Sequence, residues 1–377
     1  MGALHQPHLG ARVDAGSRRQ HLFDPGTAGI DQRTGVDGGA GADVLMGGLG
    51  DDTYIIDNVG DQVLGESHWV SRINTSSDGS QAESASYNVG LSANGGKIVF
   101  VSSASNLVAG DTNGFSDIFV KDINTDVIAR VSVASDGSQA NSSSNIPSLS
   151  WDGSKVLFSS NASNLVSADT NNTSDVFIKD LYTGVVTLIS TASDGTQANG
   201  SLSPWFTPTL SEDGSRVLFS SSASNLVPDD TNGIYDVFVK NLNTGVVTRV
   251  NTATDGSQAN NRTDSGGSLS ADGSKIAFSS LANNLVAGDT NAAWDIFVKD
   301  MNSGVITRVN TTSDGAQANG NSFASSGFLS ADGTKVVFAS NASNLVAGDT
   351  NGVSDIFVKD LNSGVITRVN TTSDGSQ

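Results

Sequence analysis

An acidic motif with oxygen-bearing side chains at positions 1, 3 and 7 recurs five times in this chain. Its pattern is Asp-Thr-Asn-x-x-x-Asp, and carboxylate and amide oxygens are the ligands that a hard cation such as Ca²⁺ prefers. The motif lacks the bidentate acid that closes an EF-hand loop, and Asp and Asn side chains also cap backbone amides in Asx turns. Calcium ligation and structural capping therefore both stay open for Asp111, Asn113, Asp117, Asp169, Asn171, Asp175, Asp230, Asn232, Asp236, Asp289, Asn291, Asp295, Asp349, Asn351 and Asp355.

The residues needed for the common kinds of catalysis are not brought together by the sequence. Cysteine is absent, which excludes thiolate chemistry. Glu212 adjoins Asp213 in a predicted tight turn, whereas a glycosidase acid needs a pocket that raises its pKa. The histidines all precede the acidic motifs, which excludes a Ser-His-Asp or histidine-metal site among them: His5, His8, His21 and His68. We therefore expect no enzymatic activity.

Residues that occur once are the remaining candidates for recognition. Trp294 and Tyr235 fall in predicted long loops, where each either stacks on a sugar or a partner side chain or packs within its own loop. The lysines recur instead at one fixed strand position, and we expect them on a solvated face: Lys121, Lys179, Lys240, Lys299 and Lys359.

The composition narrows the fold class and the partners. The 377 residues carry a formal net charge of -19, which disfavours nucleic acid and anionic membranes and favours cations or cationic surfaces. The 42 glycines, with abundant Ser, Thr, Asn and Val, indicate an all-β chain with many turns. No run of about 18 apolar residues is present, so we expect no membrane insertion.

A Ser/Thr-Asp-Gly-x-Gln signature recurs about every sixty residues, which indicates a solenoid, a propeller or an array. Within one unit the pattern predicts four short strands, a long loop after the second strand and tight turns at Asp-Gly and Ser-Gly pairs. In the fourth unit the predicted strands lie around Ser268–Ser270 and at Lys275–Ser280, Asp295–Asp300 and Val305–Asn310. Four antiparallel strands per unit describe a propeller blade, whose two long loops are expected on one rim. The signature aspartates are Asp78, Asp136, Asp194, Asp255, Asp314 and Asp374.

The segments LSADGSKIAFSS, LSEDGSRVLFSS and DIFVKDLNSGVITRV resemble TolB-type propeller repeats, and the resemblance covers residues 66–377. It implies an all-β propeller with five four-stranded blades. Residues Trp69–Asn74 match the fourth strand of a unit whose first three strands are missing, and the chain stops at Gln377 inside another signature. Two interpretations follow: part of a ring of six or more blades, or a five-bladed ring with a redundant strand.

A different repeat lies ahead of the propeller segment. Residues 38–55 read GGAGADVLM and GGLGDDTYI, two nine-residue units that resemble the repeats-in-toxin calcium-binding nonapeptide. The resemblance implies Ca²⁺ held between turns of a short parallel β-roll, and the alternative is a glycine-rich linker that happens to contain aspartates. We therefore predict a disordered leader at 1–35, the roll at 36–65 and the propeller repeats at 66–377. The predicted ligands in the roll are Gly38, Ala40, Asp43, Gly47, Leu49 and Asp52.

These patterns together predict an extracellular bacterial protein that binds calcium and attaches to a protein or a glycan through its long-loop rim, without catalysis. Two alternatives remain: a fragment of a secreted polysaccharide-active enzyme, in which unrepeated residues form the site, and a structural spacer in a large exported repeat protein.

Overall fold

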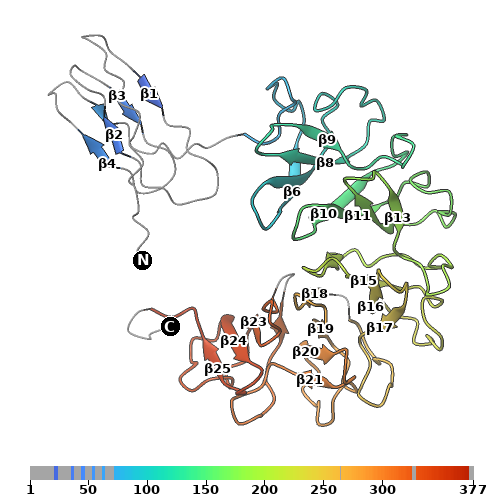
Figure 1. The fold of residues 1–377 in the computed structure, drawn as a ribbon. Helices are drawn as coiled ribbons and strands as arrows, with labels where there is room; N and C mark the ends of the chain where they lie inside the picture. Colours follow the sequence, from blue (N-terminus) through green and yellow to red (C-terminus); the bar gives the residue numbers. More distant parts are fainter. Residues whose placement is uncertain are drawn as a thin grey trace, which may run out of the picture. The chain divides into compact units, whose positions relative to one another are not determined.

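The computed structural model describes residues 72–263, 265–324 and 328–372, together with the backbone of five short strands nearer the amino terminus. The chain forms two compact units, Met1–Arg72 and Ile73–Gln377 (Figure 1). In the described residues no helix is long and apolar enough to cross a membrane.

The described strands of the first unit pair in parallel. Strands β1 (His21–Phe23), β3 (Val44–Met46) and β5 (Gln62–Val63) form one sheet, and β2 (Gly35–Asp37) pairs with β4 (Thr53–Ile55). The odd-numbered strands therefore form one sheet and the even-numbered strands the other. Successive strands along the chain alternate between the two sheets. Strand β1 falls within the predicted leader. The six predicted calcium ligands and the rest of the leader lie outside the described residues.

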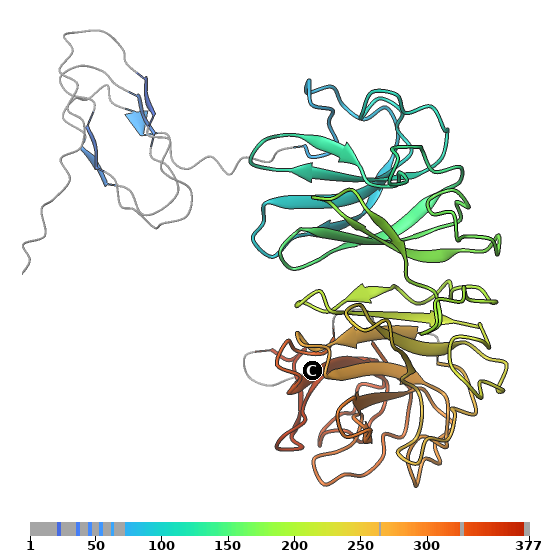
Figure 2. The same cartoon turned by 45° about the vertical axis from the view of Figure 1, so that its right-hand side comes forward.

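The second unit contains five four-stranded antiparallel sheets in sequence order, which makes it an all-β propeller array (Figures 1 and 2). The first sheet holds β6 (Ser86–Leu91), β7 (Lys97–Ser102), β8 (Asp117–Asp122) and β9 (Ile128–Arg130). The second holds β10 (Ser144–Leu149), β11 (Lys155–Ser160), β12 (Asp175–Asp180) and β13 (Val186–Leu188). The third holds β14 (Thr209–Leu210), β15 (Arg216–Ser221), β16 (Asp236–Asn241) and β17 (Val247–Arg249). The fourth holds β18 (Ser265–Leu269), β19 (Lys275–Ser280), β20 (Asp295–Asp300) and β21 (Ile306–Arg308), and the fifth holds β22 (Ser322–Phe323), β23 (Lys335–Ser340), β24 (Asp355–Asp360) and β25 (Ile366–Arg368).

The predicted strands of the fourth unit are confirmed, and β19 and β20 match their predicted bounds. Five of the six residues of each strand are buried, on both faces, because neighbouring sheets cover them, and the apolar residues Ile276, Ile296 and Val298 favour strand structure there. The turns that flank them have positive φ at Gly273 (63°) and Gly304 (73°), a backbone conformation that glycine adopts without strain.

The hydrophobic core lies between consecutive sheets. Between the first and second sheets, aliphatic side chains such as Val99 and Ile118 pack with Phe158 and Phe177. These two phenylalanines stack with ring centroids 5.8 Å apart, and every sheet carries an equivalent pair. A sheet therefore presents an aromatic leading face to the sheet before it and an aliphatic trailing face to the sheet after it.

The prediction that the recurrent lysines are solvated is wrong. Each is at most 8% exposed, because its stem runs along the junction with the segment that leads into its sheet. Lys299 Nζ donates to the carbonyl oxygen of Thr252 (2.9 Å), and Lys359 Nζ donates to that of Thr311 (3.0 Å). Those oxygens replace the water that the ammonium loses, so the lysines connect neighbouring units. The same bonds are made by Lys121, Lys179 and Lys240.

Candidate functional site

The structure brings the first four acidic loops against the signature hairpin that follows each of them. In the third unit, the Thr231 amide donates to Gln258 Oε1 at 3.2 Å, and Gln258 Nε2 donates to Thr231 Oγ1 at 3.2 Å. Gln258 also pairs with Thr252 across the hairpin. The two long loops therefore meet, as predicted, and the signature glutamine joins them.

Within the third acidic loop, the asparagine and the last aspartate act as caps. Asn232 Oδ1 accepts a bond from the Ile234 amide (3.2 Å), which forms an Asx turn. Asp236 is fully buried at the start of β16, where Asn232 Nδ2 (3.1 Å) and Asn251 Nδ2 (2.6 Å) donate to its two oxygens. These bonds hold the loop in one conformation, which is the capping role that the sequence left open.

An arginine at the end of the fourth strand lies across the two aspartates of the loop. In the third sheet, Arg249 Nη1 is 3.2 Å from Asp230 Oδ1 and 3.3 Å from Asp236 Oδ2. The guanidinium thus lies between the two carboxylates, at the position that a cation bound by this aspartate pair would take. The corresponding arginines are Arg130, Arg308 and Arg368.

These arginines were missed by the sequence reasoning, although their recurrence after the same β-branched residues was a visible signal. Among the described residues, no group of three or more His, Cys, Asp or Glu side chains is placed to hold a metal ion. Calcium ligation by the loops stays a prediction, and what the geometry shows is an ion pair combined with an Asx turn.

The second sheet departs from this pattern because Leu188 replaces the arginine. Gln197 Nε2 takes over the bridge and donates to Asp169 Oδ1 (2.8 Å) and Asp175 Oδ2 (3.0 Å). Asp169 Oδ2 is buried without a hydrogen-bond partner.

Burial raises the pKa of the Asp175 carboxyl to about 6. Burial and the neighbouring Asp236 also raise the pKa of Asp230 to about 6, so desolvation outweighs the attraction of its arginine there.

A small aromatic cluster lies on the third sheet and includes one of the predicted recognition residues. The ring of Tyr235 meets Trp205 edge to face, with centroids 6.5 Å apart, and the Arg262 guanidinium lies 5.3 Å from the Trp205 ring centre. Trp294 is partly buried, and its amide donates to Asn321 Oδ1 (2.9 Å). Glu212 is exposed in its turn, as predicted. The cluster therefore holds Tyr235 but not Trp294.

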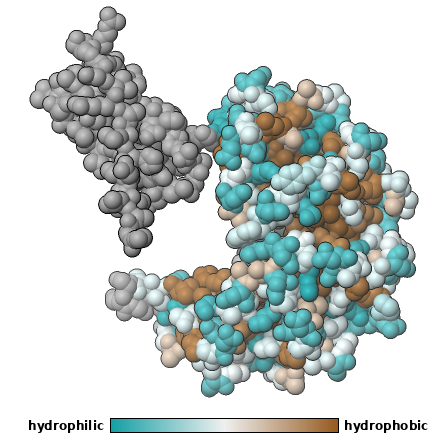
Figure 3. Space-filling model, in the orientation of Figure 1, coloured by the Kyte–Doolittle hydropathy of each residue, from teal (hydrophilic) through white to brown (hydrophobic). Residues whose placement is uncertain are grey.

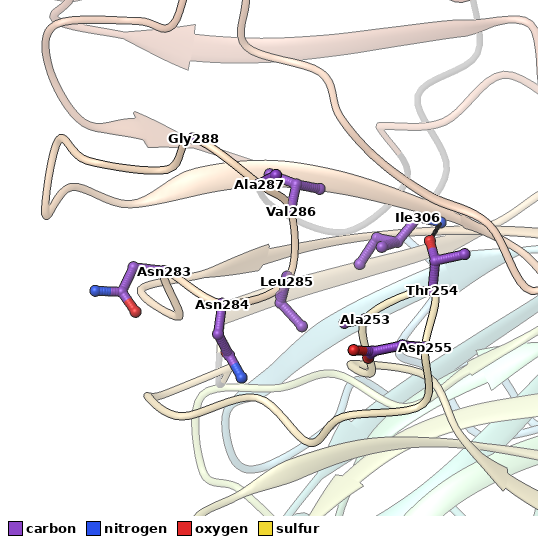
Figure 4. Close-up of a pocket in the computed structure, with 10 residues that line it drawn as sticks. All are labelled: Ala253, Thr254, Asp255, Asn283, Asn284, Leu285, Val286, Ala287, Gly288 and Ile306. Carbon is purple, nitrogen blue, oxygen red and sulfur yellow. Dashed lines mark hydrogen bonds between the residues drawn. The ribbon is translucent and has the colours of Figure 1, made fainter.

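A cavity of about 570 Å³ lies between the signature hairpin of the third unit and the long loop of the fourth (Figure 4). The Ile306 amide donates to Thr254 Oγ1 across one side of it (3.3 Å). Asp255 is the single ionisable residue of its lining, and bonds from Ser257 lower the pKa of that exposed carboxyl. The cavity thus lacks the second ionisable group that acid–base chemistry needs. Its lining consists of Ala253, Thr254, Asp255, Asn283, Asn284, Leu285, Val286, Ala287, Gly288 and Ile306.

The trailing face of the fifth sheet is open. Figure 3 shows apolar surface at this end of the sheet array. Val337, Ile356 and Val369 are 39%, 38% and 48% exposed. The equivalent residues of the other four sheets are at most 1% exposed: Val99, Ile118 and Val131; Leu157, Val176 and Ile189; Leu218, Val237 and Val250; Ala277, Ile296 and Val309. This face therefore has the composition of a buried junction without a covering sheet.

A basic side chain beside the open face also lacks the partner that its counterparts have. In three of the four interior junctions the first residue of the second strand reaches a turn glycine of the next sheet, and Lys275 Nζ donates to the Gly333 oxygen at 2.9 Å. Lys97 and Arg216 make the same bond to Gly153 and Gly273. Lys335, their counterpart in the fifth sheet, is exposed and pairs with Asp360 of its own sheet (3.1 Å).

No protein-family model matches this chain, and no curated protein matches it. Solved structures similar to it include TolB from Acinetobacter baumannii, with 19% identity, a TM-score of 0.40, and 76% of this chain and 54% of that chain covered. The putative TolB from Agrobacterium tumefaciens shares 14% identity at a TM-score of 0.44, with 76% and 81% covered. The β-propeller domain of the Trilobed protease from Pyrococcus furiosus shares 11% identity at a TM-score of 0.44, with 76% and 71% covered. The chain thus spans about half the length of the first of these structures, and the likeness concerns the propeller fold.

The predicted function, extracellular calcium-dependent binding or adhesion, is wrong on these comparisons. The similar structures include TolB proteins and proteins with peptidase propellers, such as prolyl endopeptidases and the tricorn protease, and none of these is an adhesion protein or a polysaccharide-active enzyme by name. In four of the five loops an arginine lies beside the two aspartates that the prediction gave to calcium. An extracellular location stays a prediction.

Proposed function

We propose that the second unit is a non-catalytic assembly scaffold whose open trailing face docks a further sheet of the same repeat. The observation that carries this proposal is the exposure of Val337, Ile356 and Val369, whose counterparts are buried in all four other sheets. Covering such aliphatic side chains contributes about 25 cal/mol for each Å² removed from water, so an open junction face favours a partner.

The charged groups support a scaffold rather than an enzyme. The repeated aspartates are held by arginines, amides and hydroxyls, and the described cavity holds a single ionisable residue. The open face and Lys335 beside it are available for an interaction. The partner that fits is a sheet with an aromatic leading face and a turn carbonyl for the lysine.

The test extends the chain by one unit, a second copy of residues 318–377 placed after Gln377. If the face docks a sheet, the amides of β23 and β24 gain hydrogen-exchange protection and reach the level of β19 and β20. The control extension carries serine at the copied counterparts of Phe338 and Phe357, which removes the leading face. Equal protection of β24 with and without the extension would contradict the proposal.

A further inference from the structure

We propose that Trp151 and Tyr182, on two tight turns of the second sheet, bind a proline-rich peptide that carries basic residues. This site goes beyond the docking function and does not involve the open trailing face. It follows from a comparison of the turns of the second sheet with the same turns of the other four sheets.

Two exposed aromatic residues depart from the repeat in the second sheet alone. Trp151, in the turn between β10 and β11, is 57% exposed, and Tyr182, in the turn between β12 and β13, is 79% exposed. At the position of Trp151 the other sheets carry a small or acidic residue, and at that of Tyr182 an asparagine: Ala93, Glu212, Ala271 and Ala331, then Asn124, Asn243, Asn302 and Asn362. The turns therefore form without either ring, and the rings are available for recognition.

A lysine of the first sheet connects the two turns. Lys97 Nζ donates to the Gly153 oxygen in the turn that carries Trp151 (2.9 Å), and it lies 5.3 Å from the centre of the Tyr182 ring. The Ala93 amide also donates to the Trp151 oxygen, at 3.1 Å. The cation–π contact holds the tyrosine ring beside the tryptophan turn, so a ligand loses less side-chain freedom on binding.

The spacing of the two turns fits one kind of peptide. In the strand order β10-β11-β12-β13 both turns lie on the same edge of the sheet, two strand spacings apart, which is ~9.6 Å. A polyproline II helix has three residues per turn, so prolines at positions i and i+3 lie on one side of it, ~9.3 Å apart. Such a peptide is extended before it binds, and it docks on surfaces lined by aromatic side chains.

The charge of the site favours basic residues beside the prolines. Asp152, which follows Trp151, is exposed, and its Oδ1 accepts bonds from the Ser150 hydroxyl (2.6 Å) and the Ser154 amide (2.9 Å). The Ser150 hydroxyl and the amide and hydroxyl of Ser154 lower the pKa of this carboxyl to about 2, so it is ionised at neutral pH. Its Oδ2 takes no part in these bonds. The net charge of the chain, -19, attracts the same kind of peptide.

The test uses two labelled peptides of one composition. The probe is Arg-Ala-Pro-Ala-Ala-Pro-Ala-Arg, and the control, Arg-Ala-Pro-Ala-Pro-Ala-Ala-Arg, has its prolines two residues apart. Fluorescence anisotropy with the full chain measures the affinities. The four tryptophans give four indole N–H signals in a proton–nitrogen NMR spectrum, and Trp151→Ala identifies the signal of Trp151. We expect the probe to shift that signal and to bind about fivefold more tightly than the control peptide.

The variants replace each residue by one that another sheet carries at the same position, so folding should be unchanged by circular dichroism. Trp151→Ala and Tyr182→Asn should each weaken binding of the probe about fivefold, and Asp152→Asn about threefold. Raising the salt to about 0.5 M should weaken binding to the wild type further than binding to Asp152→Asn. The matched control is Trp205→Ala, which removes a tryptophan of similar exposure (62%) from the third sheet and should leave the affinity unchanged.

Three results would overturn the proposal. The first is equal affinity for the two peptides, which would show that the proline spacing is not read. The second is a Trp151 signal that stays in place while the probe is added. The third is a shift of that signal by a neutral oligosaccharide, cellotetraose, at lower concentration than by the probe, because sugars also stack on exposed aromatic rings. None of these results depends on whether the open trailing face docks a sheet.

Discussion

The acidic loops of the second and third sheets have the same spacing of aspartates but a different group between them. In the third loop Arg249 lies between Asp230 and Asp236, within 3.3 Å of both. In the second loop the neutral amide of Gln197 makes the bridge instead, because Leu188 stands where the arginine would be. The shape of the loop is retained in both sheets, while its charge differs by one unit.

The two loops show separately what the hydrogen-bond geometry of the bridging group does and what its charge does. The amide supplies hydrogen bonds of normal length to both carboxylates, so it fixes their positions as well as the guanidinium does. It supplies no positive charge, so the second loop retains two buried acids without a counter-ion. The comparison teaches that the repeated aspartates are architectural, and that the fold accepts either an ion pair or a protonated acid at this place.

The largest effect should come from converting the third loop into the second. Arg249→Leu leaves Asp230 and Asp236 buried without a cation, and loss of one partner of a buried ion pair costs about 3–5 kcal/mol. Urea unfolding at pH 7 measures the change in the free energy of unfolding. The matched control is Arg249→Leu combined with Asp230→Asn, which should recover a substantial part of the loss. A loss below about 1 kcal/mol would show that the arginine is dispensable.

The second loop should make stability depend on pH. The folded pKa of Asp175 is about 6, above the ordinary aspartate value of 3.8, so the folded state binds the proton more tightly than the unfolded state does. The resulting stabilisation is complete below pH 3.8 and is lost as the pH rises through 6. The rise of this pKa from 3.8 to about 6 corresponds to roughly 3 kcal/mol. Melting curves from pH 4 to 8 for the wild type and Asp175→Asn check this, and parallel curves would contradict it.

Removal of the bridging amide should affect the second loop more than the third. Gln197→Ala removes the donor of Asp169 Oδ1 and one of the donors of Asp175, which keeps its bond from Ser190 Oγ, and should cost about 2 kcal/mol, as for buried acceptors that lose their bonds. Gln258→Ala removes bonds to Thr231 and should cost about 1 kcal/mol, because the third loop keeps its arginine. Equal losses in urea unfolding would show that the glutamine has one role in both loops.

The smallest change should come from converting the second loop into the third. Leu188→Arg places a guanidinium beside Asp169 and Asp175 and lowers the pKa of Asp175. We expect a gain of about 1 kcal/mol at pH 7 and none at pH 4, where Asp175 is protonated. Chemical unfolding at the two pH values measures this, and a net loss at pH 7 would indicate that the loop is too closely packed for the longer side chain.

The repeat units and strands were predictable because their signals are local. Pairs such as Asp272-Gly273 mark turns that need positive φ, and the β-branched runs between them mark the strands. The buried state of Lys299 was not predictable in this way, because the carbonyl that receives it belongs to Thr252, in the preceding unit. The ion pair of Arg249 was equally hidden, since Asp230 is distant from it in sequence. Exposure of Val337 depends on a missing neighbour, and its own sequence matches that of its buried counterparts.

The lysine that connects each sheet to the segment before it also determines how the array responds to force. Every such bond joins only adjacent units, so a load applied at the two ends passes through the junctions in series. The fifth sheet has one junction instead of two and should give way first. Extension of the molecule should then give a saw-tooth record, with one peak for each sheet that is released.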